Sequence, residues 1–128
     1  MRKSLLLFKG VVVLGCLFFI SCATTTKVDS LTSNYQAKSD DCEVKFYKNK
    51  EDKPSQNYES IGKIESHIKL NFFFGGKVKL EDDAFSELRK KACGLGGDAV
   101  LIDDFVESSV SEMTHVHVWA TVIRFQEK

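Results

Sequence analysis

Two histidines near the end of the chain have a spacing that suits metal binding. His115 and His117 are separated by one residue in a segment rich in Val and Thr. In a β-strand, alternation places both imidazoles on one face, about 7 Å apart at their Cα atoms. Imidazoles bind Zn²⁺ and Cu²⁺, and a third ligand such as His67 or Glu112 would be required. The pair therefore suggests a metal site, although the half-exposed polar face of a sheet explains it more simply.

Cys42 and Cys93 form a second candidate group. In an exported domain two cysteines can form a disulfide, and a loop of this length would contribute about 4 kcal/mol in the chain-entropy model. The alternative is two free thiols. A catalytic cysteine is not indicated, because neither thiol has a histidine near it in the sequence. The sequence favours the bridge and leaves the free thiols open.

Acidic pairs do not indicate a hydrolase. Asp82 and Asp83 suit the first turn of a helix, and alternation along a strand would point Asp103 and Asp104 to opposite faces. The chain has no Ser-His-Asp set, HExxH motif, P-loop or dinucleotide fingerprint. We therefore expect a protein that is not an enzyme and needs no cofactor.

Three consecutive aromatic residues, Phe72, Phe73 and Phe74, precede Gly75-Gly76. Three adjacent side chains cannot all face one core, so at least one is expected near the surface. Such a residue would mark a contact surface for a protein partner or a membrane. The alternative is that both faces of a sheet bury them.

The elements that must position these residues are one helix and several strands. Apolar residues recur at three- and four-residue spacing from Leu80 to Leu95, which predicts a helix over this segment. Gly94 is the expected C-cap at its end. Strands are expected over 43–47, 58–74, 98–106 and 114–125. The order β-β-α-β-β predicts a small α+β domain with one helix packed on a sheet.

The junction between this helix and the next strand has a recognisable sequence. Residues 92–100 read ACGLGGDAV, which resembles the A-x-x-x-G-A-D-A-V corner of the Rcs stress-sensor lipoproteins and the YbjQ-like domains. Gly97 stands where alanine is usual. The resemblance implies the α+β fold and a role as an envelope lipoprotein. It implies no catalytic residue, no stress-sensing role, because the cysteine spacing differs, and no metal-ligand motif.

The first 22 residues resemble the signal region of bacterial lipoproteins. Basic residues precede an apolar run of eleven residues, 10–20, and Phe19-Ile20-Ser21-Cys22 resembles a lipobox. The run is shorter than the roughly 20 residues of a transmembrane helix. The resemblance implies cleavage before Cys22 and a lipid anchor on its sulfur. The alternatives are lipidation of Cys16, after Val13-Leu14-Gly15, and an uncleaved anchor.

The sequence thus divides into a signal peptide over residues 1–21, Cys22 with a flexible polar tether over 22–41, and a folded domain over 42–128. The alternative to the tether is a packed N-terminal strand through Val28 and Leu31. The whole chain has no net charge, and loss of residues 1–21 removes three of its 18 basic residues and leaves a net charge of −3. This balance argues against nucleic-acid binding.

We therefore expect a non-catalytic lipoprotein of the bacterial cell envelope. Its predicted partner is the membrane, through the lipid anchor on Cys22, and the sequence identifies no protein partner. Ala23 is not the aspartate that retains lipoproteins in the inner membrane of enteric bacteria, which favours the outer membrane. An envelope metal-binding protein that uses His115 and His117 is the alternative.

Overall fold

The computed structural model describes residues 24–32, 35–48, 51–71, 77–110 and 113–127. Its elements, in chain order, are β1 (Thr24–Ser30), β2 (Lys45–Tyr47), β3 (Tyr58–Asn71), α2 (Lys77–Gly94), β4 (Ala99–Val110) and β5 (Met113–Phe125). Five strands and one helix among these residues confirm the predicted α+β class. One strand, β1, was not expected.

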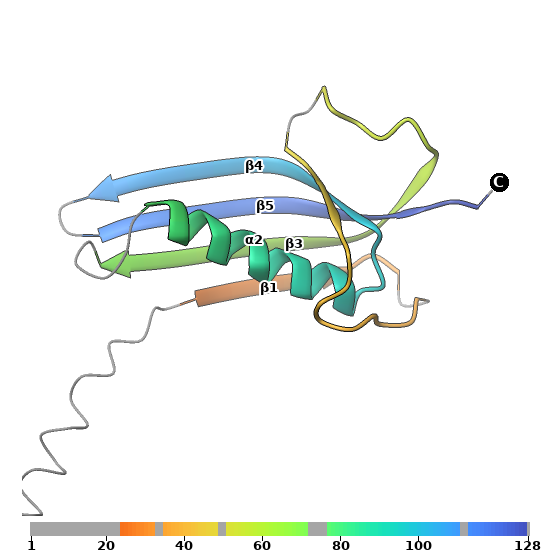
Figure 1. Ribbon diagram of the computed structural model, residues 1–128, viewed down its shortest axis with the longest axis horizontal. Coiled ribbons are helices and arrows are strands. Elements are labelled where there is room, and N and C mark those ends of the chain that lie inside the picture. The colour runs from red at the N-terminus through yellow and green to blue at the C-terminus, as the bar shows by residue number, and fades with distance from the viewer. Residues whose placement is uncertain (1–23, 33–34, 49–50, 72–76, 111–112, 128) are drawn as a thin grey trace, which may run out of the picture.

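All five strands belong to one sheet, in the order β1-β3-β5-β4-β2. The last strand along the chain, β5, therefore lies in the centre, antiparallel to both β3 and β4. β1 adds antiparallel to the outer side of β3, whereas β2 adds parallel to β4 at the other edge. The long strands β3, β4 and β5 set the length of the domain (Figure 1).

Helix α2 covers one face of this sheet and forms the core with it (Figure 1). Four residues of the predicted apolar stripe are buried: Leu80, Ala84, Leu88 and Ala92. Even-numbered residues of β3 and β5 meet them from the sheet, among them Ile64, Ile68, Val116, Val118 and Val122. The α-helical and strand periodicities in the sequence therefore indicated the correct faces.

The C-terminal end of α2 is determined by Gly96 rather than by the expected Gly94. Gly96 has φ of +77°, a left-handed conformation that glycine adopts without a steric penalty. Its amide donates to the carbonyl of Cys93 at 2.9 Å, and the Gly97 amide donates to that of Ala92 at 2.9 Å. This pair of bonds is the Schellman arrangement. No helix among the described residues has the length and apolar content needed to cross a bilayer.

The N-terminal segment differs from the flexible tether expected over residues 22–41. β1 pairs along its whole length with β3, from Thr24 opposite Ile68 to Ser30 opposite Gly62. Apolar alternation is absent here because an edge strand buries little, and Val28 is 40% exposed. Backbone pairing and the β preference of threonine account for this strand. The sheet therefore begins at Thr24, not at residue 42.

The segment that follows β1 also packs on the domain. The Tyr35 hydroxyl donates to the Glu59 carboxylate at 2.7 Å, and the Lys38 amide donates to the Cys93 carbonyl at 2.8 Å. These contacts carry the chain across the C-terminal end of α2 towards β2. The part of residues 22–41 that the structure describes is thus largely ordered by contacts with the rest of the domain.

A disulfide between Cys42 and Cys93 holds this segment against α2, with Cα atoms 5.9 Å apart. This bond confirms the disulfide that was predicted from the sequence between these two cysteines. Cys93 is completely buried in the core. The bridge joins residues 51 positions apart and thereby links the start of β2 to the last turn of α2.

Removal of this bridge should destabilise the domain strongly. The chain-entropy model gives about 4 kcal/mol for a loop of this size, a large share of the stability of a small domain. We expect a reductant to lower the urea midpoint of the wild-type protein. A Cys42→Ser/Cys93→Ser variant should start at that lower midpoint and show no response to reductant. Equal midpoints for oxidised wild type and the double variant would contradict this account.

Candidate functional site

The sheet face opposite α2 carries the histidines. His67 of β3 lies directly opposite His117 of β5, and His115 lies opposite Lys69. Trp119 follows on the same face of β5. We call His67, His115, His117 and Trp119 the histidine face. No element of the described chain covers it, and all four side chains are partly exposed.

The rings of the histidine face form a stacked row across two strands. His117 stacks on Trp119 with ring centroids 3.7 Å apart, and on His67 with centroids 4.7 Å apart. His67 in turn stacks on His115 at 5.7 Å. The prediction that His115 and His117 share one face is therefore correct. His67 joins them because antiparallel pairing brings β3 beside β5.

This arrangement differs from a preformed metal site. The rings of His67 and His117 lie nearly parallel, 12° apart, so they stack instead of converging on one point. His117 Nε2 is already 2.5 Å from the Glu65 carboxylate. Across the described residues, no group of three His, Cys, Asp or Glu side chains is placed to hold a metal ion. The described geometry thus offers stacking and hydrogen bonding.

The environment of His67 disfavours its protonated form. Partial burial lowers its pKa from the ordinary 6.5, and the neighbouring His117, Lys69 and His115 lower it further. Glu65 opposes this effect but does not reverse it. Near neutral pH the row therefore contains a neutral imidazole, which stacks without like-charge repulsion.

A shallow cavity of about 310 Å³ lies beside Trp119 on this face. Charged residues line most of it: Lys27, Asp29, Lys63, Glu65 and Asp103. Lys63 Nζ contacts the Asp103 carboxylate at 3.1 Å and donates to Thr121 Oγ1 at 2.5 Å. The Thr121 hydroxyl donates to Asp103 at 2.7 Å. Lys63, Asp103 and Thr121 thus satisfy one another, and the charged side chains of the cavity are two lysines and three acids.

The strand pairing changes the expectation for Asp103 and Asp104. The register shifts between Ile102 and Asp104, which indicates a β-bulge, and simple alternation ends there. Asp104 lies opposite Trp119, while Asp103 bonds Thr121 two residues further along β5. Both acids are therefore on the side of the histidine face. Asp103 is held by Lys63 and Thr121, so the two carboxylates do not form a free acid pair.

Two predicted positions lie outside the described residues. These are the contact surface at Phe72, Phe73 and Phe74, and the lipidation site at Cys22. Two residues that the structure makes important, Glu65 and Lys38, were not identified from the sequence. Glu65 and His67 alternate along β3 on the side of the sheet that faces solvent, a signal that a period of two could have identified. Nothing local in the sequence marks Lys38.

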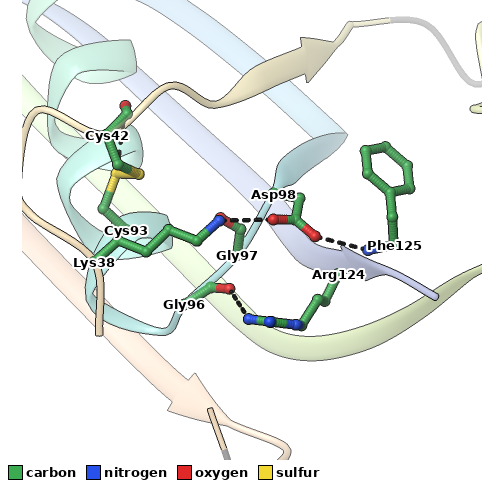
Figure 2. A network of polar contacts seen from close by, with 8 residues as sticks. All are labelled: Lys38, Cys42, Cys93, Gly96, Gly97, Asp98, Arg124 and Phe125. Carbon is green, nitrogen blue, oxygen red and sulfur yellow. Dashed lines mark hydrogen bonds and ion pairs between the residues drawn. A yellow bond between two sulfur atoms is a disulfide. The ribbon is translucent and has the colours of Figure 1, made fainter. Parts of the chain in front are cut away.

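The helix–strand corner, which the resemblance singled out, is a structural junction (Figure 2). The Asp98 carboxylate accepts a hydrogen bond from Lys38 Nζ at 2.6 Å and another from the Phe125 amide at 2.9 Å. Lys38 also donates to the Gly97 carbonyl at 2.8 Å, and Arg124 donates to the Gly96 carbonyl at 3.0 Å. Burial raises the pKa of Asp98, but the bonds from Lys38 and Phe125 outweigh it and lower the pKa overall.

The same junction explains why position 97 is a glycine. A Cβ atom there would collide with the side chain of Val122, which is fully buried in the central strand. The glycine lets the turn pass closely over β5, as it must for the Asp98 amide to donate to the Ile123 carbonyl at 2.9 Å. Gly96 and Gly97 thus end the helix and allow close packing on β5.

Comparison with known proteins supports the fold alone. No protein-family model matches the chain, and no curated protein matches it significantly. Among solved structures, a crystal structure of the Francisella virulence factor FvfA is similar, with a TM-score of 0.54 and 16% sequence identity. The alignment covers 77% of this chain and 97% of the Francisella protein. At this identity the likeness extends to the arrangement of the elements and not to any site.

His67 should make the stability of the domain depend on pH. Its pKa is lower in the folded state than in the unfolded chain, so the unfolded chain binds more protons as the pH falls through about 6.5. The contribution of His67 to the free energy of unfolding is thus fully present above that pH and is lost as the pH falls below it. We expect His67→Gln to lose less unfolding free energy than wild type between about pH 7 and pH 5 in urea titrations. Parallel declines would contradict this assignment.

Asp98 should contribute stability at neutral pH through its charge. Because its folded-state pKa is lowered, this contribution is present above about pH 4 and is lost as the pH falls below that value. Asp98→Asn, which keeps the shape, should cost about 1–2 kcal/mol at neutral pH after allowance for partial exposure. Lys38→Met removes the side-chain partner of Asp98. The loss of unfolding free energy in the Lys38→Met/Asp98→Asn double variant should be smaller than the sum of the losses in the two single variants. Additive costs would show that the two residues act independently.

Proposed function

We propose that this protein is a bacterial envelope lipoprotein, anchored by acyl chains on Cys22, whose α+β domain acts by binding or by structural presence. Catalysis is not part of the proposal, and neither is a cofactor. The lipid anchor is proposed from the N-terminal sequence, and the binding or structural role of the domain from the geometry of its surface.

The main observation that supports a lipid anchor is the position of Cys22 relative to the first strand. Residues 1–21 have the order of a lipoprotein signal peptide, and Ala23 alone separates Cys22 from β1 at Thr24. Among the described residues, the hydrophobic core consists of side chains that lie between Tyr35 and Phe125 in the sequence. Cleavage before Cys22 would therefore remove no residue of the described core.

The anchor at Cys22 and the sequence after it together suggest where the protein resides. Two or more acyl chains give stable attachment where one chain gives reversible binding. Ala23 lacks the retention aspartate of enteric bacteria, so the outer membrane is the proposed location. The net charge of −3 after cleavage gives no general attraction to anionic headgroups, which leaves the acyl chains as the main source of attachment.

The charged groups on the uncovered face support a non-catalytic domain. His117 is paired with Glu65, and Lys63 with Asp103. The stacking of His117 on Trp119 and His67 supports a role in recognition through stacking and hydrogen bonds. Metal binding through His115 and His117 is the weaker alternative, because the stacked rings would have to rotate before they could share an ion.

Labelling with palmitate in growing cells tests the anchor. The thioether forms on a cysteine sulfur, so Cys22→Ala should abolish incorporation of label and leave the signal peptide uncleaved. Cys16→Ala is the matched control, since it removes the rival site and should retain both the label and the processed mass. Label that survives Cys22→Ala but not Cys16→Ala would move the anchor to Cys16. Absence of label from wild type would overturn the proposal.

A further inference from the structure

The start of β1 lies at the end of the domain where β3 and β4 end and β5 begins (Figure 1). Thr24 pairs with Ile68, and Ile68 with Val116, so these three residues share one row across the sheet. β3 continues for three residues beyond this row, to Asn71, which pairs with Met113. At about 3.3 Å per residue, the strand ends project about 10 Å beyond Thr24.

The chain between the proposed lipid anchor and β1 is too short to separate the domain from a membrane. Two residue steps connect Cys22 to Thr24, which corresponds to at most about 7 Å even when the chain is extended. This reach is smaller than the projection of β3 and the β4–β5 hairpin past Thr24. If Cys22 carries acyl chains in the bilayer, this end of the sheet must therefore lie at the bilayer surface.

The side chains at that end suit a lipid surface. Val110 and Met113 pair across the hairpin and are 65% and 41% exposed, which makes Val110 the most exposed large apolar residue among those described. Behind them, a hydrogen bond between Ser109 and Thr114 of 3.2 Å holds the two strands together. Lys69 is exposed on β3 and supplies a positive charge next to the row of Thr24, Ile68 and Val116. An exposed apolar pair with a nearby cation is suited to the headgroup boundary.

We infer that the β4–β5 hairpin end, through Val110 and Met113, seats on the membrane to which Cys22 anchors the protein. This inference rests on the proposed lipidation of Cys22 and adds an orientation to it. The strands then stand at a steep angle to the bilayer, with the helix–strand corner at the far end. The domain is held against the surface instead of moving freely on a tether.

Quenching of tryptophan by brominated lipids tests this orientation. The full protein, purified from native membranes, is reconstituted into phosphatidylethanolamine–phosphatidylglycerol vesicles with a brominated-acyl fraction. One variant carries Val110→Trp and the matched control carries Leu31→Trp, both with Trp119→Phe. Leu31 is a suitable control because it is also apolar and 55% exposed but follows the opposite end of β1. If the Trp119→Phe background fails to fold, the same pair is measured with Trp119 retained, whose emission is common to both.

The proposal expects the tryptophan at position 110 to lose most of its emission and the one at position 31 to keep it. Equal quenching at both positions would mean that the sheet lies flat, and no quenching at either would mean that the domain stands away from the lipid. Either result overturns the inference. Flotation with the vesicles and the intact mass of the acylated protein are measured in parallel. Failure of those two measurements would instead overturn the lipid anchor itself.

Discussion

The fold depends on one carboxylate and one disulfide that meet at the C-terminal end of α2. Asp98 receives hydrogen bonds from Lys38 and from the amide of Phe125, and so joins the segment after β1 to the end of the central strand. The Cys42–Cys93 bridge fixes the same segment a few residues later. A 14-residue stretch with few apolar side chains crosses the domain between β1 and β2, and these contacts determine its path. Polar contacts and a covalent bond thus add to the apolar packing that Tyr35, Cys42 and Val44 make with the core.

Periodicity in the sequence predicted the elements whose side chains enter the core. The stripe from Leu80 to Ala92 and the apolar runs of β4 and β5 identify their own faces, because burial imposes the repeat of each element. The same reasoning could not find β1. An edge strand made of Thr, Lys, Asp and Ser buries little and is stabilised by backbone pairing with β3. Such pairing is determined by a partner far along the chain and leaves no local signal.

The histidine face was partly predictable for a related reason. Alternation put His115 and His117 together, since both lie on one strand. The position of His67 depends on the register between β3 and β5, and the position of Asp103 depends on a bulge. Both are products of tertiary pairing. Contacts between side chains then occupy two of these groups, because Glu65 bonds His117 and Lys63 bonds Asp103.

The central place of β5 has a consequence for how the chain acquires its structure during synthesis. β5, Met113–Phe125, pairs with both β3 and β4 and follows both of them along the chain, so the middle of the sheet is completed only after β5 has been synthesised. Until then β1 can pair with β3 as an isolated two-stranded ribbon, which is marginal in water. Most pairings join distant parts of the chain, which favours slow, late folding. Until β5 is in place, the facing edges of β3 and β4 have no partner strand within this sheet.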